Sequence, residues 1–314
     1  MSIIEKAAGK IGTGAPKPGV VANPAETARD ASLIESALSK QGSSSHASPF
    51  IATTVEPIFS DPDASVMEGN SQVQSINLAR LHRMGVVSPD AEKSKIAEEF
   101  RIIKRPLIAN AFGQGAARVK NGNLIMVTSS LPGEGKSFCA INLAISMAME
   151  MDRTVLLIDA DVAKPRVPEY LGIHADKGLL DVLQDKNLKL SDVMIKTDIA
   201  KLTILPAGRT YKRATELLAS AAMTRLIEDI GNRYPDRIIL FDSPPLLATS
   251  ESSVLATHMG QIVMVVEAEK TSQDAVREAL SHIQSCEVVG MLLNKTTPTP
   301  GADYYYGHYG SYGK

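Results

Sequence analysis

Ser130-Leu-Pro-Gly-Glu-Gly-Lys-Ser137 is the stretch of this 314-residue chain that decides its fold. An apolar, strand-length run, Leu124–Thr128, precedes it, and Phe138–Met149, which has helical periodicity, follows it. Glycines allow backbone N–H groups to approach and surround phosphates, and the start of a helix adds a partial positive charge. The stretch therefore predicts a phosphate-binding loop, although Ser130 stands where the usual motif has its first glycine.

The loop carries the groups that bind a magnesium-nucleoside triphosphate. Lys136 is expected to reach the β- and γ-phosphates, and the Ser137 hydroxyl is expected to ligate magnesium. The sequence thus predicts ATP and Mg²⁺ as ligands. The predicted nucleotide contacts are Ser130, Leu131, Pro132, Gly133, Glu134, Gly135, Lys136, Ser137, Phe138 and, as a candidate for recognition of the base, Asn294.

Beyond the loop, strand-length apolar runs alternate with stretches of helical periodicity. The further runs are Thr154–Ile158, Leu202–Pro206, Ile238–Phe241, Ile262–Glu267 and Val288–Leu293. Helical stretches such as Ala214–Arg233 and Ser272–Ser285 separate most of them. Strands that are apolar on both faces and alternate with helices predict an α/β fold with a mostly parallel sheet covered on both sides.

Aspartates follow two of these runs. Thr154–Ile158 leads into Asp159 and Asp161, and a single carboxylate, Asp242, follows Ile238–Phe241. The carboxyl ends of parallel strands converge on the crevice where ligands bind. Asp242 is the candidate magnesium ligand, which leaves Asp159 and Asp161 for a further magnesium contact and for accepting a proton from a hydroxyl. One aspartate after a strand is usually a helix cap, but three near a phosphate loop indicate a functional site.

The composition excludes several classes of function. A net charge of −2 provides no basic field for nucleic acid or anionic lipid. No apolar run approaches the roughly 18 residues of a membrane-spanning helix, and Met1–Lys10 lacks the apolar core of a signal peptide. Membrane association is therefore expected through a partner and not by insertion. Cys139 and Cys286 lack metal-ligand spacing and are expected to be buried thiols in a reducing cytoplasm.

Three regions are predicted along the chain. Residues 1–75 are expected to be mostly flexible with local helices, residues 76–295 to form the P-loop domain, and residues 296–314 to be a Tyr-rich tail.

Two helices are predicted ahead of the loop. Ile76–Met84 is expected to be helical and to end at Gly85. Asp90–Asn110 is a second helical stretch, which Pro106 should end or kink near Arg105.

These motifs together resemble those of the bacterial tyrosine kinases, a branch of the ParA/MinD-like P-loop ATPases. The family's Walker A, A′ and B motifs correspond to Ser130–Ser137, to Val155–Asp161 and to Ile238–Asp242 with the Ser-Pro-Pro that follows. Other blocks that look like those of the family are Asp159–Pro165, Gly178–Leu183, Pro206–Gly208, Glu216–Ser220 and Asn294–Lys295. Met1–Ala7 and Glu99–Pro106 resemble the tyrosine autokinases encoded with exopolysaccharide and exosortase systems. The resemblance covers about residues 76–314, and the chain has no His-Arg-Asp or Asp-Phe-Gly set of the eukaryotic kinases.

The resemblance implies a cytoplasmic protein-tyrosine autokinase that regulates exopolysaccharide synthesis or export. A separate inner-membrane polysaccharide chain-length or co-polymerase protein would recruit and activate it. The carried-over residues are Lys136, Asp159 and Asp161 for catalysis and Ser137, Asp159 and Asp242 for magnesium. Ala163 stands where many relatives have an arginine, so any phosphate clamp there would pass to Lys164.

An assembly motif of the family is matched in part. Glu98, Arg101 and Lys104 occupy its Glu-x-x-Arg-x-x-Arg spacing, with lysine in place of the second arginine. The resemblance implies a ring-like homo-oligomer, although lysine loses bidentate pairing. A solvated, charged helix face would have the same pattern.

Five of the eight tyrosines lie in the last eleven residues: Tyr304, Tyr305, Tyr306, Tyr309 and Tyr312. The density of glycines among them argues against a buried strand, and the near absence of cations argues against stacking on nucleic acid. The tail is interpreted as the autophosphorylation substrate of a neighbouring copy, since an extended chain from Asn294 to Tyr312 spans about 60 Å. Phosphates would add negative charge and favour release of the tail.

Two other functions fit parts of the pattern. A ParA/MinD-type ATPase switch would share the loop, but such proteins carry a signature lysine where this chain has Leu131, and they lack a tyrosine cluster. A non-catalytic partner that binds nucleotide would not need the complete set of aspartates.

Overall fold

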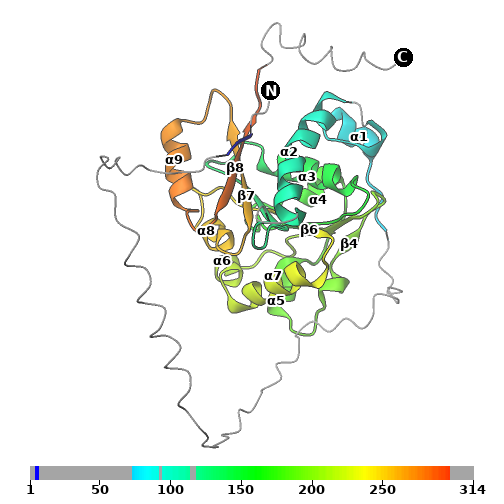
Figure 1. Ribbon diagram of the computed structural model, residues 1–314. Coiled ribbons are helices and arrows are strands. Elements are labelled where there is room, and N and C mark those ends of the chain that lie inside the picture. The colour runs from blue at the N-terminus through cyan, green and yellow to red at the C-terminus, as the bar shows by residue number, and fades with distance from the viewer. Residues whose placement is uncertain (1–3, 7–72, 92–93, 114–117, 298–314) are drawn as a thin grey trace, which may run out of the picture. The chain divides into compact units, whose positions relative to one another are not determined.

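The computed structural model describes residues 4–6, 73–91, 94–113 and 118–297 (Figure 1). The Tyr-rich tail from residue 298 on, and therefore all five predicted phosphorylation sites, lies outside the described residues. The same holds for residues 7–72, most of the region predicted to be flexible.

An eight-stranded sheet with the order β1-β8-β7-β2-β6-β3-β5-β4 forms the centre of the fold. All pairs among its six inner strands are parallel. The inner strands are β2 (Leu124–Ser129), β3 (Thr154–Asp159), β5 (Leu202–Leu205), β6 (Arg237–Asp242), β7 (Gln261–Glu267) and β8 (Val288–Asn294). Each coincides with a predicted apolar run, so the predicted parallel sheet is confirmed.

Two short antiparallel strands flank this sheet. β4 (Ile195–Lys196) pairs with β5, and β1 (Ile4–Lys6) pairs with β8. β1 is a short strand within the region predicted to be mostly flexible with local helices, and the sequence analysis did not predict it. A three-residue strand has too little periodicity to be found in sequence, and its pairing depends on an edge almost three hundred residues away.

Helices cover both faces of the sheet, as predicted (Figure 1). Alternate residues of one strand serve the two faces: Val155 and Leu157 join one apolar core, and Leu156 and Ile158 join the other. On the first face lie α1 (Leu78–Arg83), α2 (Lys95–Phe112), α3 (Lys136–Ala148) and α4 (Val167–Leu171). On the second lie α5 (Leu179–Gln184), α6 (Ala214–Leu218), α7 (Ala221–Arg233), α8 (Glu251–Ala256) and α9 (Gln273–Ser281).

Two predicted helices differ from the structure. α2 continues through Pro106 to Phe112, because Leu107 and Ala111 are buried beyond the proline. The carbonyl that loses its helical partner belongs to Ile102, which is 45% exposed, so water can reach that side. The stretch predicted as one helix from Ala214 divides into α6 and α7, because the Ser220 hydroxyl accepts the N–H of Met223 and starts a new helix.

Within the described part of the chain, the helices are too short or too polar to cross a lipid bilayer.

Candidate nucleotide site

The phosphate-binding loop joins β2 to α3 at the carboxyl edge of the sheet. Gly133 and Gly135 have φ of +90° and +99°, a region that disfavours side chains. At Gly135 a Cβ would also lie 2.1 Å from Nδ2 of Asn294, so a larger residue there would displace that side chain. Gly135 is directly followed by Lys136, the first residue of α3, as expected for a loop that places phosphates at a helix N-terminus.

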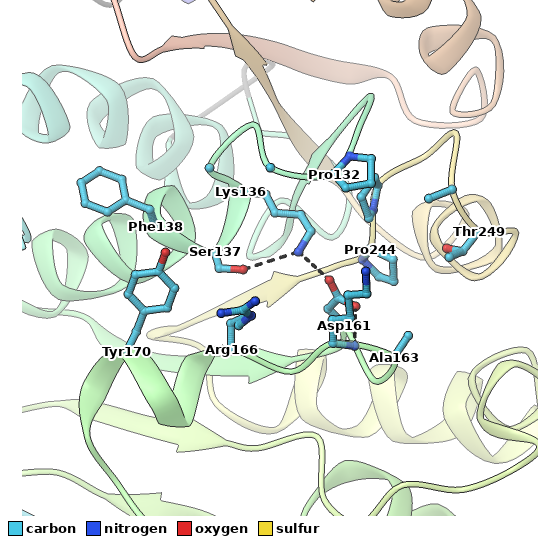
Figure 2. A pocket seen from close by; sticks show the side chains of 15 residues that line it. Pro132, Lys136, Ser137, Phe138, Asp161, Ala163, Arg166, Tyr170, Pro244 and Thr249 are labelled. Atoms are coloured by element: carbon cyan, nitrogen blue, oxygen red, sulfur yellow. Dashed lines mark hydrogen bonds and ion pairs between the residues drawn. The ribbon is translucent and has the colours of Figure 1, made fainter.

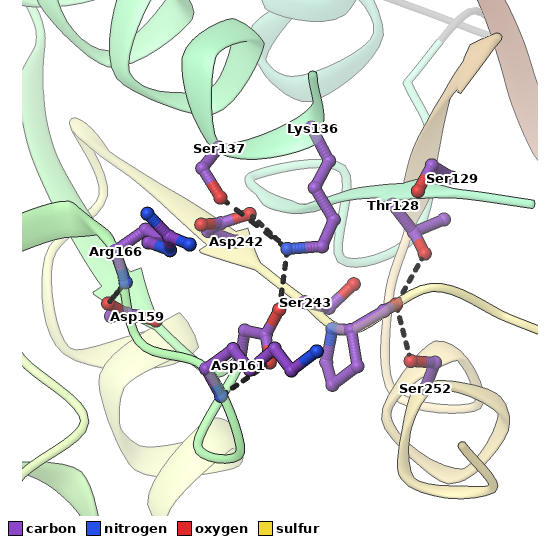
Figure 3. A network of polar contacts seen from close by, with 12 residues as sticks. Thr128, Ser129, Lys136, Ser137, Asp159, Asp161, Arg166, Asp242, Ser243 and Ser252 are labelled. Atoms are coloured by element: carbon purple, nitrogen blue, oxygen red, sulfur yellow. Dashed lines mark hydrogen bonds and ion pairs between the residues drawn. The ribbon is translucent and has the colours of Figure 1, made fainter. Parts of the chain in front are cut away.

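Two aspartates and a serine lie around the Lys136 ammonium (Figure 3). Nζ lies 2.5 Å from Oδ2 of Asp161, 3.9 Å from Oδ1 of Asp242 and 3.4 Å from Oγ of Ser137. Burial acts to lower the pKa of Lys136, but the carboxylates of Asp242 and Asp161 outweigh it and raise the pKa. The lysine is therefore a fixed positive charge beside the loop.

Asp242 ends β6 as a buried carboxylate without hydrogen-bond partners for either oxygen. Burial raises its pKa to about 6, while the charge of Lys136 and the nearby Ser137 hydroxyl oppose the rise. Such unpartnered oxygens beside a serine hydroxyl are what a hard divalent cation prefers. Asp242 and Ser137 therefore fit the magnesium ion that the sequence predicts.

Asp159 lies at the register position opposite Asp242, at the end of β3. Its Oδ2 accepts the backbone N–H groups of Arg166 and Val167, both at 3.0 Å, while Oδ1 lacks a partner. Burial and the charge of Asp242 raise its pKa well above the usual range. Oδ2 of this carboxylate thus holds the start of α4, and Oδ1 is available for an indirect contact to a cation.

A cavity of about 390 Å³ opens in front of the loop. Figure 2 shows Phe138 and Tyr170 toward one end of it and Pro132 and Thr249 toward the other. Of the predicted site residues, those lining the cavity are Pro132, Gly133, Gly135, Lys136, Ser137, Phe138 and Asp161. The lining does not include the other predicted nucleotide and magnesium residues, Ser130, Leu131, Glu134, Asp159, Asp242 and Asn294.

Some of the lining was not predicted as binding residues. Arg166 and Tyr170 come from the segment after β3, and Pro244, Pro245, Ala248 and Thr249 follow β6. Ala163 and Lys164, at the position of the family's clamp, line it as well. The Ser-Pro-Pro after Asp242 was a sequence signal for part of this set, but Arg166 and Tyr170 had none, because only the path of the chain after β3 brings them to the cavity.

The predicted assembly residues lie on α2 in two different environments. Glu98 and Arg101 form a partly exposed ion pair. Lys104 is buried, donates to the Ser146 carbonyl at 2.5 Å and pairs with Glu150 at 2.7 Å. Its charge therefore joins α2 to α3 within one chain.

Comparisons with known proteins agree with this geometry. A family model described as an AAA domain matches residues 122–294. The tyrosine-protein kinase CpsD of Streptococcus agalactiae is 30% identical over 198 residues, which cover 62% of this chain and 83% of CpsD. EpsB of Ralstonia solanacearum is 32% identical over 203 residues, 64% of this chain but only 26% of EpsB. The chain thus spans about a quarter of the length of its larger relatives.

Solved structures show the same fold. The chimerical protein CapA2B2 has a TM-score of 0.58 at 27% identity and covers 72% of this chain and 94% of its own. The kinase domain of the Escherichia coli tyrosine kinase ETK has a TM-score of 0.60 and covers 73% of this chain and 84% of its own, and at 22% identity it supports the fold alone. The shared sequence, the loop and the three carboxylates show that the chain belongs to the family of bacterial tyrosine-protein kinases.

Proposed function

We propose that this protein is an ATP- and Mg²⁺-dependent protein-tyrosine autokinase. The observation that carries the proposal is the position of Lys136 between the carboxylates of Asp161 and Asp242, in the lining of a cavity beside a P-loop. Tyrosine-protein kinases such as CpsD share most of their length with this chain.

Each group has a role in this proposal. Ser137 and Asp242 would hold magnesium, with Asp159 in an outer contact. The ion would neutralise phosphate charge and orient the β- and γ-phosphates. Lys136 stabilises the charge that develops as the tyrosine oxygen bonds to the γ-phosphorus and the bond to the ADP oxygen breaks.

Asp161 is the better supported acceptor of the tyrosine proton. Its side chain lines the cavity, whereas Asp159 lies outside the lining and uses one oxygen to hold the start of α4. Proton transfer to Asp161 requires its contact with Lys136 to open first, and an arriving γ-phosphate is an anion that can draw the lysine away.

The acceptors in this proposal are the tail tyrosines of a second copy, at positions 304, 305, 306, 309 and 312. The tail begins at residue 296, just after β8 ends at Asn294, close to the loop. Assembly would use the face of α2 that carries Glu98 and Arg101, supported from behind by Lys104.

Regulation of exopolysaccharide synthesis or export, through recruitment to the inner membrane by a separate co-polymerase protein, is part of the proposal. The succinoglycan biosynthesis transport protein ExoP of Rhizobium meliloti, 32% identical over 245 residues, supports this context. A ParA/MinD-type ATPase switch is less well supported, because the signature lysine is replaced by an exposed Leu131.

Phosphotyrosine formation tests the proposal. Purified protein is incubated with magnesium and ATP, with and without a candidate membrane activator, as wild type, as Lys136→Met and as a chain truncated after Pro300. We expect phosphotyrosine on the wild type alone, and a variant with all five tail tyrosines changed to phenylalanine as a matched control for the truncation should also remain unlabelled.

Mixing identifies transfer between copies. The truncated chain keeps the site, and the full-length Lys136→Met chain keeps the tail, so label should appear on the latter when both are present. Absence of label from the wild type under every condition would overturn the kinase proposal, and equal labelling of the truncated chain alone would overturn the role of the tail.

A further inference from the structure

A group of side chains outside the cavity holds the phosphate loop from behind. We call Glu134, Thr271, Asn294 and Lys295 the loop buttress. None of the four lines the cavity. They come from the loop itself, from the turn after β7 and from the end of β8, so distant parts of the chain meet at the loop.

Glu134 provides the acceptors of the buttress. It is 2% exposed, and its Oε2 accepts the backbone N–H of Leu131 at 2.6 Å. Its Oε1 accepts the Thr271 hydroxyl and the backbone N–H of Glu267 at 3.3 Å. One buried carboxylate thus joins the start of the loop to the carboxyl end of β7.

Asn294 and Lys295 provide the donors. Nδ2 of Asn294 lies 2.9 Å from the carbonyl oxygen of Glu134, and Nζ of Lys295 lies 2.8 Å from that of Gly133. Glu267 holds the same lysine ammonium at 3.1 Å. Lys295 has a φ of +55°, which is unfavourable for lysine, so its contacts offset a strained backbone.

These two hydrogen bonds determine how the loop peptides point. The described peptides are trans and planar, so the C=O and N–H of one peptide lie on opposite sides. Holding the carbonyls of Gly133 and Glu134 toward β8 turns the N–H groups of Glu134 and Gly135 the other way, to the side where Gly133 and Gly135 line the cavity. Backbone N–H groups in that orientation are the ones that bind phosphate.

We infer that the loop buttress is a set of positioning residues that preset the loop amides for the phosphates of ATP. The inference rests on the proposed nucleotide binding and gives Asn294 a different task from base recognition. It also explains why an acidic residue, Glu134, is compatible with an anion-binding loop: both of its oxygens are used behind the loop.

The test compares how strongly variants bind adenosine, AMP, ADP and a non-hydrolysable ATP analogue, measured by calorimetry with magnesium. Lys295→Met should lower the affinity for the ATP analogue and for ADP about tenfold, which is the effect of losing one hydrogen bond from a charged donor. Thr271→Val and Asn294→Asp should act in the same direction. The affinity for adenosine should change by less than about twofold, because adenosine has no phosphate that the loop amides could bind.

Lys270→Met is the matched control. Lys270 also pairs with Glu267, at 3.3 Å, but its described hydrogen bonds and ion pairs do not reach the loop, so its replacement should leave all four affinities unchanged. Lys295→Arg should restore most of the affinity for the ATP analogue.

The outcomes separate the inference from the proposed function. An equal loss for adenosine and the ATP analogue would overturn it, indicating base recognition or a general structural defect. Unchanged affinities in Lys295→Met and Thr271→Val would also overturn it while leaving the kinase proposal intact. A wild type that binds no ATP analogue would overturn both.

Discussion

Lys136 and Asp161 contact each other directly, with Nζ and Oδ2 separated by 2.5 Å and the two side chains only 11% and 7% exposed. The two residues have different roles in the proposed transfer: Lys136 stabilises charge on the phosphoryl group, and Asp161 receives the tyrosine proton. In the absence of nucleotide they neutralise each other, which avoids an unpaired buried charge.

Asp161→Asn should therefore separate binding from chemistry. We expect phosphotyrosine formation to fall by about 10²–10⁴-fold, the contribution of a positioned base, while affinity for ATP changes only a few-fold. Initial rates of labelling and calorimetric affinities measure the two effects. If Asp161→Asn labelled at the wild-type rate and Asp159→Asn lost most of its labelling rate, Asp159 would be the acceptor of the proton.

Asp242→Asn should stabilise the nucleotide- and magnesium-free protein at pH 7.5, by about 3 kcal/mol. Because burial raises the folded-state pKa of Asp242 from 3.8 to about 6, the folded state binds this proton more tightly than the unfolded state does. The carboxyl thus destabilises the fold increasingly as pH rises from about 4 to about 6 and fully above that range.

Urea unfolding at pH 5 and pH 7.5 measures this effect, with the exposed Asp176→Asn as control. The increase in the free energy of unfolding caused by Asp242→Asn should be greater at pH 7.5 than at pH 5. A gain independent of pH, or a loss of stability, would contradict the prediction.

Asp159→Ala should be less stable than Asp159→Asn by about 1–2 kcal/mol. Both variants remove the buried charge, but asparagine keeps an oxygen that can accept the N–H groups of Arg166 and Val167. Thermal unfolding compares the two, and hydrogen exchange at Val167 should be faster only in the alanine variant. Equal stability of the two variants would show that this oxygen does not hold the start of α4.

Lys104→Met should destabilise each protomer by about 1–3 kcal/mol, because it removes the contacts to the Ser146 carbonyl and to Glu150. Arg101→Gln, on the more exposed face of α2, should change stability by under about 0.5 kcal/mol but reduce oligomer formation. Unfolding and sedimentation measurements separate the roles. If Lys104→Met dissociated the oligomer without lowering protomer stability, the lysine would belong to the interface.

Patterns repeated along a single segment were predictable from the sequence. The inner strands are apolar on both faces, and such runs between helical stretches indicate a parallel sheet. Once the sheet is parallel, Asp159 and Asp242 end their strands on the same edge as the start of the helix at Lys136, and in the structure these two strands are neighbours. The carboxylate cluster follows from topology, so it too was predictable.

Contacts between distant segments were not predictable. Lys104 has the spacing of a surface motif, yet its ammonium reaches a carbonyl 42 residues away. The carboxylate of Glu134 meets Thr271, 137 residues along the chain, and nothing in the loop motif indicates that contact. The continuation of α2 past Pro106 likewise depends on tertiary packing, which local helix propensity does not reveal.

The two short antiparallel strands, β1 and β4, have a consequence for self-association. A long parallel strand at the end of a sheet offers a row of unsatisfied backbone groups to any extended peptide. In the described residues, β8 pairs with the three-residue antiparallel strand β1, and β5 pairs with the two-residue antiparallel strand β4. Little backbone is left for another chain to extend the sheet. In the proposed assembly, copies of this protein should therefore recognise each other through their side chains and not through added strands, which disfavours fibrous growth.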